Sequence, residues 1–148
     1  MALLRVLVGL RRNNRVTVKT LVKWAFPEEI TSFGSSPSIA TDKQGHVHIV
    51  YINDWGTGWS GYLAYANNKT GTWVRDRELT ESGDIYYKSM AVDSEGYIHI
   101  IYATGSSGDK SIMYINNIAG EWSNPSLIKE HTGDCASLKL HLDSQRWI

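Results

Sequence analysis

The amino-acid sequence predicts an all-β fold, and within that class a β-propeller, because the chain repeats one strand-rich unit about every 50 residues. Tryptophans recur at equal spacing along the chain, at Trp24, Trp73 and Trp122. Segments 38–51 and 89–102 share the pattern Ser-x-Ala-x-Asp-x-x-Gly-x-x-His-Ile-x-Tyr. No segment shows the sustained spacing of apolar residues, with caps, that indicates an amphipathic helix.

Each of these two units begins with a short strand and a tight turn. We expect strands over 38–41 and 89–92, each ending at an Asp-x-x-Gly sequence. Asp42 suits the first position of the turn, because its short carboxylate can accept hydrogen bonds from the backbone that follows. Gly45 suits a position that requires a positive φ. The corresponding residues of the next unit are Asp93 and Gly96.

Two apolar strands follow the turn in each unit. Many β-branched and aromatic side chains predict second strands over 47–52 and 97–103. Their almost continuous apolar character predicts burial on both faces. Loops rich in glycine and serine come next, at 53–61 and 104–110, and after them we expect third strands over 62–67 and 111–116.

A fourth strand completes each unit. The turns at 68–71 and 117–120 end in glycine and lead to strands that we expect to begin near Trp73 and Trp122. Four short strands per unit, with one tryptophan and turn glycines in fixed places, are typical of a β-propeller blade. One blade cannot bury both of its faces, so blades stack on their neighbours. We therefore expect the repeated tryptophans, including Trp24, to fill the space between adjacent blades.

The repeat predicts one half-ring, over 1–148, of three four-stranded blades. The expected units are 1–35, 36–86 and 87–135, and 136–148 would supply the first strand of a blade shared between two chains. Three blades are too few to close a ring of about four to eight. An open arc exposes apolar faces and unpaired strand edges. We therefore expect a second copy as the partner, in a homodimer of six blades, although residues 1–20 match the repeat poorly.

Composition restricts the partners further. The formal net charge is zero, with 15 basic and 15 acidic side chains, so we expect no nucleic acid and no anionic membrane surface as partner. No apolar run approaches the ~18 residues that span a membrane. A single cysteine, Cys135, excludes an internal disulfide and leaves the cellular compartment undetermined.

The repeat also resembles a known family. Its Asp-x-x-Gly-x-x-His-Ile-x-Tyr core, followed by Tyr-Ala-Asn and Gly-x-Trp, is similar to bacterial β-propeller repeats that occur in tandem in large secreted and surface proteins. The resemblance covers about 24–148. The repeat is more loosely similar to the Asp-box propellers of the sialidase family, but Lys69 and Ile118 stand where that box has aspartate. These resemblances imply a propeller fold and sugar binding, although fold alone does not fix function.

No catalytic residue, metal site or cofactor is predicted. His48 and His99 occupy the same place in two units. Unless both face a central channel, they lie too far apart to share one metal ion, which needs three or four converging ligands. We expect each histidine to bond the backbone or the aspartate of the neighbouring turn. Glycoside hydrolysis needs two positioned carboxylates, and the acidic residues here recur in turns, which favours a non-enzymatic protein.

The best candidate for ligand binding is the loop that breaks the repeat. It reads Asn53-Asp54-Trp55-Gly-Thr-Gly-Trp59-Ser-Gly61, whereas the equivalent loop over 104–110 has no aromatic residue. Tryptophan rings stack on the C–H face of a sugar, and Asp54 and Asn53 can bond its hydroxyl groups. Alternatively, Trp55 and Trp59 fold over the blade or pack in a subunit interface, where tryptophan is also enriched.

Three functions remain as hypotheses at this point. The first is a non-enzymatic module that binds a ligand or a partner, with a glycan as the favoured ligand. The second is a glycoside hydrolase related to the sialidases. The third is a purely structural or protein-interaction scaffold.

Overall fold

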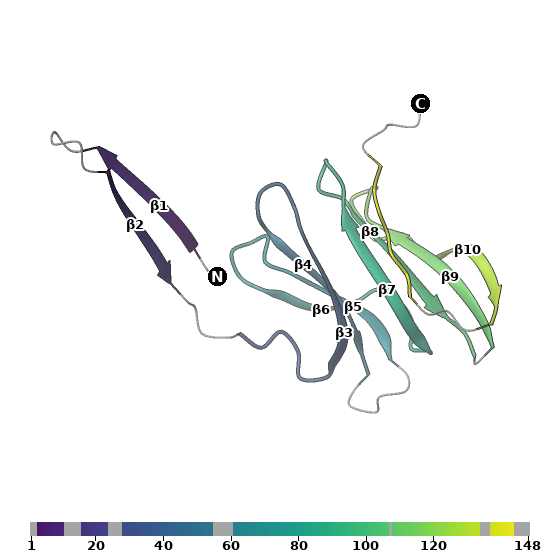
Figure 1. The fold of residues 1–148 in the computed structure, drawn as a ribbon. Coiled ribbons are helices and arrows are strands. Elements are labelled where there is room, and N and C mark those ends of the chain that lie inside the picture. Colours follow the sequence, from purple (N-terminus) through teal and green to yellow (C-terminus); the bar gives the residue numbers. More distant parts are fainter. Residues whose placement is uncertain are drawn as a thin grey trace.

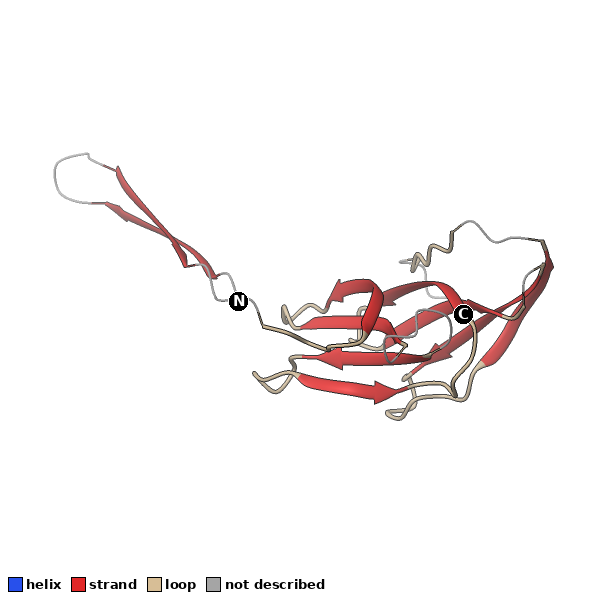
Figure 2. Ribbon diagram, turned by 90° about the horizontal axis from the view of Figure 1, so that it is seen from below, coloured by secondary structure: helices blue, strands red, loops and turns tan. Residues whose placement is uncertain are grey.

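The computed structural model describes residues 3–10, 16–23, 28–54, 61–106, 108–133 and 137–143, with side chains from residue 28 onward except that of Asp76. Every regular element in these residues is a β-strand (Figure 2). The all-β class predicted from the sequence is therefore confirmed. Among the described residues no helix is long and apolar enough to cross a membrane.

The strands form three antiparallel sheets, each joined in sequence order (Figure 1). The N-terminal hairpin consists of β1 (Leu3–Leu10) and β2 (Val16–Lys23). Sheet 1 contains β3 (Gly34–Thr41), β4 (Val47–Asn53), β5 (Tyr62–Asn67) and β6 (Val74–Glu78). Sheet 2 contains β7 (Ile85–Val92), β8 (Ile98–Thr104), β9 (Asp109–Asn116) and β10 (Ser126–Thr132). Figures 1 and 2 both show sheets 1 and 2 next to each other and the hairpin apart from them.

Sheets 1 and 2 correspond to the two units in which the repeat is strongest. The second and third strands lie where the sequence predicts them. The first strands begin earlier than predicted, because the ladder between β3 and β4 continues past Pro37 through a register shift between Ser35 and Ser38, and proline is tolerated at such bulges. β10 begins later than predicted, since Pro125 has no N–H to give to a ladder.

The two ends of the chain contain fewer strands than the two central units. The sequence predicts that 1–35 supplies strands of a blade shared with a second chain, and the strands described before β3 form a two-stranded hairpin. Residues 137–143 form no strand, although the Leu140 N–H donates to Ser89 Oγ at 3.0 Å and so holds this segment beside β7. The described residues therefore form two four-stranded sheets instead of three, and neither sheet closes on itself.

The turns between first and second strands follow the prediction. Asp42 Oδ1 accepts hydrogen bonds from the backbone N–H groups of Gln44 and His46, at 3.0 and 2.8 Å. Gly45 has a φ of 83° and Gly96 a φ of 88°, a conformation that strains residues with a Cβ. The aspartate and the glycine thus act together to bend the chain from one strand into the next.

The main core lies between sheets 1 and 2. The side chains that form it are at most 7 % exposed. Sheet 1 contributes Val50, Leu63 and Tyr65, and sheet 2 contributes Met90, Ile98, Ile100, Tyr102 and Ile115. A second cluster, on the opposite side of sheet 1, contains Tyr51, Tyr62, Ala64 and Ala66, with Ile30 and Trp73 packed against it. Sheet 1 is therefore apolar on both sides.

Repeat-equivalent residues show that the two sheets meet through opposite faces. We call front face the side that carries Met90, Ile100 and Trp122 in sheet 2, and Ile39, Ile49 and Trp73 in sheet 1. We call back face the side that carries Val50, Leu63, Tyr65 and Leu79 in sheet 1, and Ile101, Ile112, Tyr114 and Ile128 in sheet 2. The core forms where the back face of sheet 1 meets the front face of sheet 2.

Trp122, the repeated tryptophan of sheet 2, fills the space between the two sheets, as predicted. The Trp122 ring packs against the main core and meets the Tyr65 ring edge-on, with centroids 5.0 Å apart. Such aromatic pairs add ~0.5–1.5 kcal/mol beyond the area they bury. Trp73 packs on the front face of sheet 1, and Trp24 lies outside the described residues.

Replacing Trp122 with alanine is expected to lower the free energy of unfolding by about 3 kcal/mol, because it opens a cavity between the sheets. Equilibrium urea denaturation measures this loss. Ile118→Ala serves as control, since Ile118 lies in the same turn region and is 49 % exposed; its effect should stay within about 0.5 kcal/mol. An equally small effect of Trp122→Ala would contradict its role in the core.

Candidate functional site

The loop that the sequence proposes as a ligand site connects β4 to β5. Asn53 ends β4 with a side chain that is only 6 % exposed, and its amide donates a hydrogen bond to the Tyr62 hydroxyl at 2.9 Å. Asp54 is half-buried. The Asn53 side chain therefore stabilises the end of the sheet. Trp55 and Trp59 lie outside the described residues.

Gly61 holds the other end of this loop. Its backbone exchanges two hydrogen bonds with that of Gly83, at 3.1 and 2.8 Å. A Cβ at position 61 would collide with the backbone carbonyl of Asn53, so this close approach requires glycine. The pairing fixes the base of the loop beside the linker between β6 and β7.

A cavity of about 590 Å³ lies at that linker, between sheets 1 and 2. Small-molecule sites typically have volumes of about 300–1,000 Å³. Its polar lining consists of Glu78, Thr80, Glu81, Ser82, Thr104 and Asn124. Leu79, Ile85, Pro125 and the ring of Tyr102 supply apolar surface. Mixed polar and apolar walls of this kind suit a ligand that is itself amphipathic.

Tyr102 is the aromatic residue among the described residues that line the cavity. Its side chain is only 4 % exposed, and burial raises the pKa of its hydroxyl to about 12, so the phenol stays protonated. The hydroxyl makes no hydrogen bond with any of the described residues. Among the described residues no buried side-chain nitrogen or oxygen lacks a partner, so the Tyr102 hydroxyl is open to solvent and is free to donate and accept hydrogen bonds at the cavity.

A separate polar network lies at the opposite end of sheet 1. Asp42 Oδ2 is 2.8 Å from His46 Nδ1 and 3.4 Å from His48 Nε2. His48 is fully buried, and its Nδ1 lies 2.5 Å from the hydroxyl of Tyr65. The sequence predicts the contact between histidine and turn aspartate, which is confirmed. It does not predict the tyrosine, although Tyr65 and Tyr114 recur at equivalent positions.

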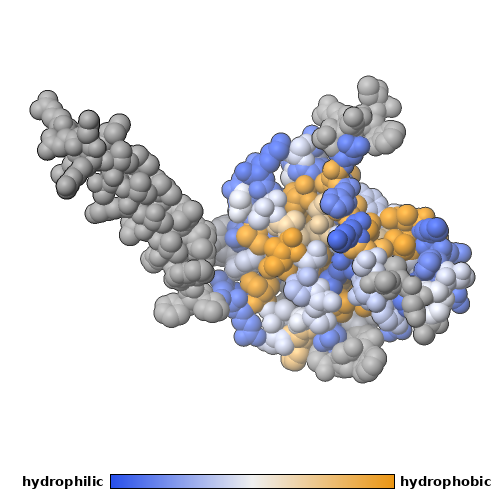
Figure 3. All heavy atoms as spheres, in the orientation of Figure 1, coloured by the Kyte–Doolittle hydropathy of each residue, from blue (hydrophilic) through white to orange (hydrophobic). Residues whose placement is uncertain are grey.

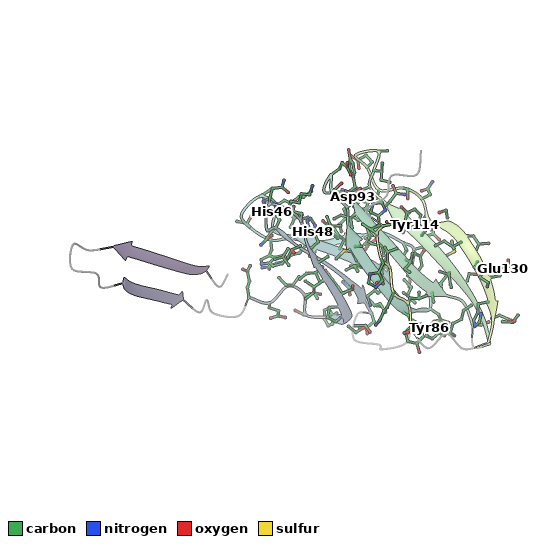
Figure 4. The ribbon with its side chains drawn as sticks, turned by 45° about the horizontal axis from the view of Figure 1, so that its top comes forward. His46, His48, Tyr86, Asp93, Tyr114 and Glu130 are labelled. Carbon is green, nitrogen blue, oxygen red and sulfur yellow. The ribbon has the colours of Figure 1, made fainter. Side chains whose placement is uncertain are left out.

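Sheet 2 repeats the network. Asp93 Oδ2 lies 3.2 Å from His99 Nε2, and His99 Nδ1 lies 2.7 Å from the Tyr114 hydroxyl. Figure 4 labels His48 in the first network and Asp93 and Tyr114 in the second. An aspartate, a histidine and a tyrosine in a row can relay protons, but the duplication in both sheets indicates that each set fastens a turn to two strands.

Burial and hydrogen bonds act in opposite directions on the first network. Burial alone would raise the pKa of the Asp42 carboxyl, but hydrogen bonds from His46 and His48 outweigh it and hold this pKa well below its usual range. Burial is the main cause that lowers the pKa of His48, although Asp42 opposes it. At neutral pH the pair is therefore a carboxylate that accepts a hydrogen bond from a neutral imidazole.

No metal centre emerges from the part of the chain that the structure describes. Within it, no three His, Cys, Asp or Glu side chains lie close enough together to hold a metal ion.

Comparisons of the chain with protein families, with curated proteins and with solved structures found no match. The function is therefore inferred from the cavity, the sequence of the 53–61 loop and the faces of the sheets.

Acidification from pH 7 to pH 5 is expected to lower the free energy of unfolding. The pKa of His48 is lower in the folded chain than its ordinary value of about 6.5, so the unfolded chain binds a proton more readily in this range. His48→Asn should reduce the slope of stability against pH, measured by urea denaturation at each pH. The exposed His141 provides the control His141→Asn, and equal slopes in the two variants would contradict the role of His48.

Proposed function

We propose that the protein is a non-enzymatic binding module made of β-propeller blades, which a second copy completes into a six-bladed ring and which binds a glycan. The proposal of a dimer rests on one observation. The back face of sheet 2 has the same apolar pattern as the back face of sheet 1, and in sheet 1 that surface is buried by a neighbouring sheet.

Exposure differs sharply between equivalent residues of the two back faces. Val50 and Leu63 are fully buried, whereas their equivalents Ile101 and Ile112 are only half-buried. Ile128 is 57 % exposed, although its equivalent Leu79 packs against the core. Apolar residues thus remain between polar ones on the molecular surface (Figure 3). A front face stacked on sheet 2 would bury them.

The front face of sheet 1 supports the same conclusion. Ile39 is 62 % exposed, whereas its equivalent in sheet 2, Met90, is 7 % exposed. One chain therefore has two apolar faces that no neighbouring four-stranded sheet covers, namely the front face of sheet 1 and the back face of sheet 2. Faces that differ in this way generate head-to-tail contacts, which can close into a ring.

Both terminal segments supply incomplete parts of a further blade. The β1–β2 hairpin has two strands, and an isolated two-stranded hairpin is marginally stable in water. Residues 137–143 lie beside β7 without a ladder partner. The hairpin of one copy and the 137–143 segment of the other would together form most of the shared blade, which would cover the back face of sheet 2.

The ligand-binding part of the proposal rests on the 53–61 loop and the adjoining cavity. The loop provides Trp55, Trp59 and Asp54, and its base is fixed beside the cavity by the Gly61–Gly83 pair. The Asp–His–Tyr network is duplicated, buried in sheet 1 and half-buried in sheet 2, which supports a structural use of these groups instead of catalysis.

A glycoside hydrolase is the second candidate, because two carboxylates line the cavity, those of Glu78 and Glu81. Paired carboxylates are the catalytic groups of most glycosidases. Steady release of nitrophenol from nitrophenyl glycosides, abolished by Glu78→Gln or Glu81→Gln, would favour this candidate and contradict the non-enzymatic proposal.

Light scattering during size-exclusion chromatography should give about twice the chain mass of 16.6 kDa. The reason is that two copies cover the apolar faces that one copy leaves open. A stable monomer at micromolar concentration would contradict the six-bladed ring.

A matched pair of variants tests the surface itself. Ile128 and Leu127 are neighbours on β10 and similarly exposed, at 57 % and 54 %, but the equivalent of Leu127 in sheet 1 is the exposed Glu78. Ile128→Glu should shift the light-scattering mass toward the monomer, because it places a charge in the covered face. Leu127→Glu should leave the dimer intact, and the opposite order would show that the face is wrongly assigned.

A further inference from the structure

We infer that the cavity between sheets 1 and 2 is the binding site for a neutral mono- or disaccharide, and that the Tyr102 hydroxyl is one of its hydrogen-bonding contacts. This inference rests on the proposed glycan-binding function and names its site. The sequence points to the 53–61 loop, whereas the cavity is formed by residues of the linker and of both sheets.

The polar groups of the cavity match a ligand with many hydroxyl groups. Thr80, Ser82 and Thr104 can each donate and accept a hydrogen bond, and Asn124 offers a separate donor and acceptor. The Glu78 and Glu81 carboxylates are acceptors for hydroxyl donors, and hydrogen bonds to charged acceptors are stronger than neutral ones. A sugar presents both donors and acceptors around its ring, so it can use this mixture.

Tyr102 offers a ligand both an aromatic ring and a hydroxyl group. Its side chain lines the cavity while being 4 % exposed, and its hydroxyl has no partner among the described residues. No buried polar side-chain atom of the described residues lacks a partner, so this hydroxyl is exposed to solvent at the cavity. A ligand hydroxyl can take the place of that solvent, and the ring itself can contact the apolar C–H groups of the sugar.

The charges of the wall select against acidic sugars. The lining contains two carboxylates and no lysine, arginine or histidine. An anionic sugar would therefore meet like charges without a compensating cation. We expect neutral hexosides to bind and sialic acid to be excluded, which is the opposite of what the arginine cluster of a sialidase site would produce.

The position of the cavity connects it with the loop that carries Trp55 and Trp59. Gly83 is part of the cavity wall and pairs with Gly61 at the end of the loop. The loop is thus attached at the rim of the cavity.

The experiment uses the full chain and isothermal titration calorimetry with the methyl glycosides of glucose, galactose, mannose and N-acetylglucosamine, and with N-acetylneuraminic acid. Tyr102→Phe removes only the unpartnered hydroxyl, so the melting temperature should not change. Affinity for the glycoside that binds should fall about three- to tenfold, as expected for one lost hydrogen bond. Tyr97→Phe is the control, because Tyr97 lies in the turn at the other end of β8.

Three results would overturn the inference. They are equal affinity of Tyr102→Phe and wild type, binding of N-acetylneuraminic acid in preference to the neutral glycosides, and no heat of binding with any neutral glycoside at millimolar concentration. A loss of binding in Trp55→Ala/Trp59→Ala with full binding in Tyr102→Phe would place the sugar on the loop alone. Light scattering on the same samples tests the ring separately, so a failure of the assembly is distinguished from a failure of the site.

Discussion

The structure depends on one constraint, which is that each four-stranded sheet is apolar on both faces. In β5 five consecutive residues, Tyr62 to Ala66, are buried, although neighbouring side chains of a strand point to opposite sides. Such a sheet is stable only when another layer covers each side. Sheet 2 covers the back of sheet 1. The front of sheet 1 receives Ile30, and the 137–143 segment lies against the first strand of sheet 2. Apolar surface on the front of sheet 1 and on the back of sheet 2 stays exposed, and we propose that a second copy covers it.

The polar networks link the turns to this stacking. Asp42 fixes its own turn through two backbone N–H groups and contacts His48, which in turn contacts the Tyr65 hydroxyl. The Tyr65 ring then meets Trp122 of the next unit. A chain of contacts thus runs from a turn, across β4 and β5, into the space between the sheets. Asn68 fastens the other side of this turn by accepting a hydrogen bond from the Val47 N–H at 2.7 Å. Asn117 does the same for the equivalent turn of sheet 2, with the Ile98 N–H at 2.6 Å.

The sequence predicted correctly those features that depend only on residues close together in the chain. Gly45, Asp42 and the apolar run of β4 predict a turn and a buried strand, because their physics involves only their neighbours in sequence. The repeat added the correct place of Trp122 between units. It was less informative at the ends, where residues 1–20 lack the motif and the described part forms a hairpin alone.

The candidate site was predicted only in part. Asn53 was expected to bond the hydroxyl groups of a sugar, and in the structure its amide donates to the Tyr62 hydroxyl. The cavity could not be predicted, because its walls come from segments far apart in sequence.

Hydrogen exchange, followed by mass spectrometry at protein concentrations above and below the assembly midpoint, tests most directly whether a second copy covers the open faces. Local protection reports the stability of each strand, and assembly makes that stability depend on concentration. We predict that peptides of β1, β2 and β10 gain protection as concentration rises, whereas peptides of β4 and β5 do not change. Exchange of β1, β2 and β10 at the same rate at every concentration would contradict the completion of the fold by a second chain.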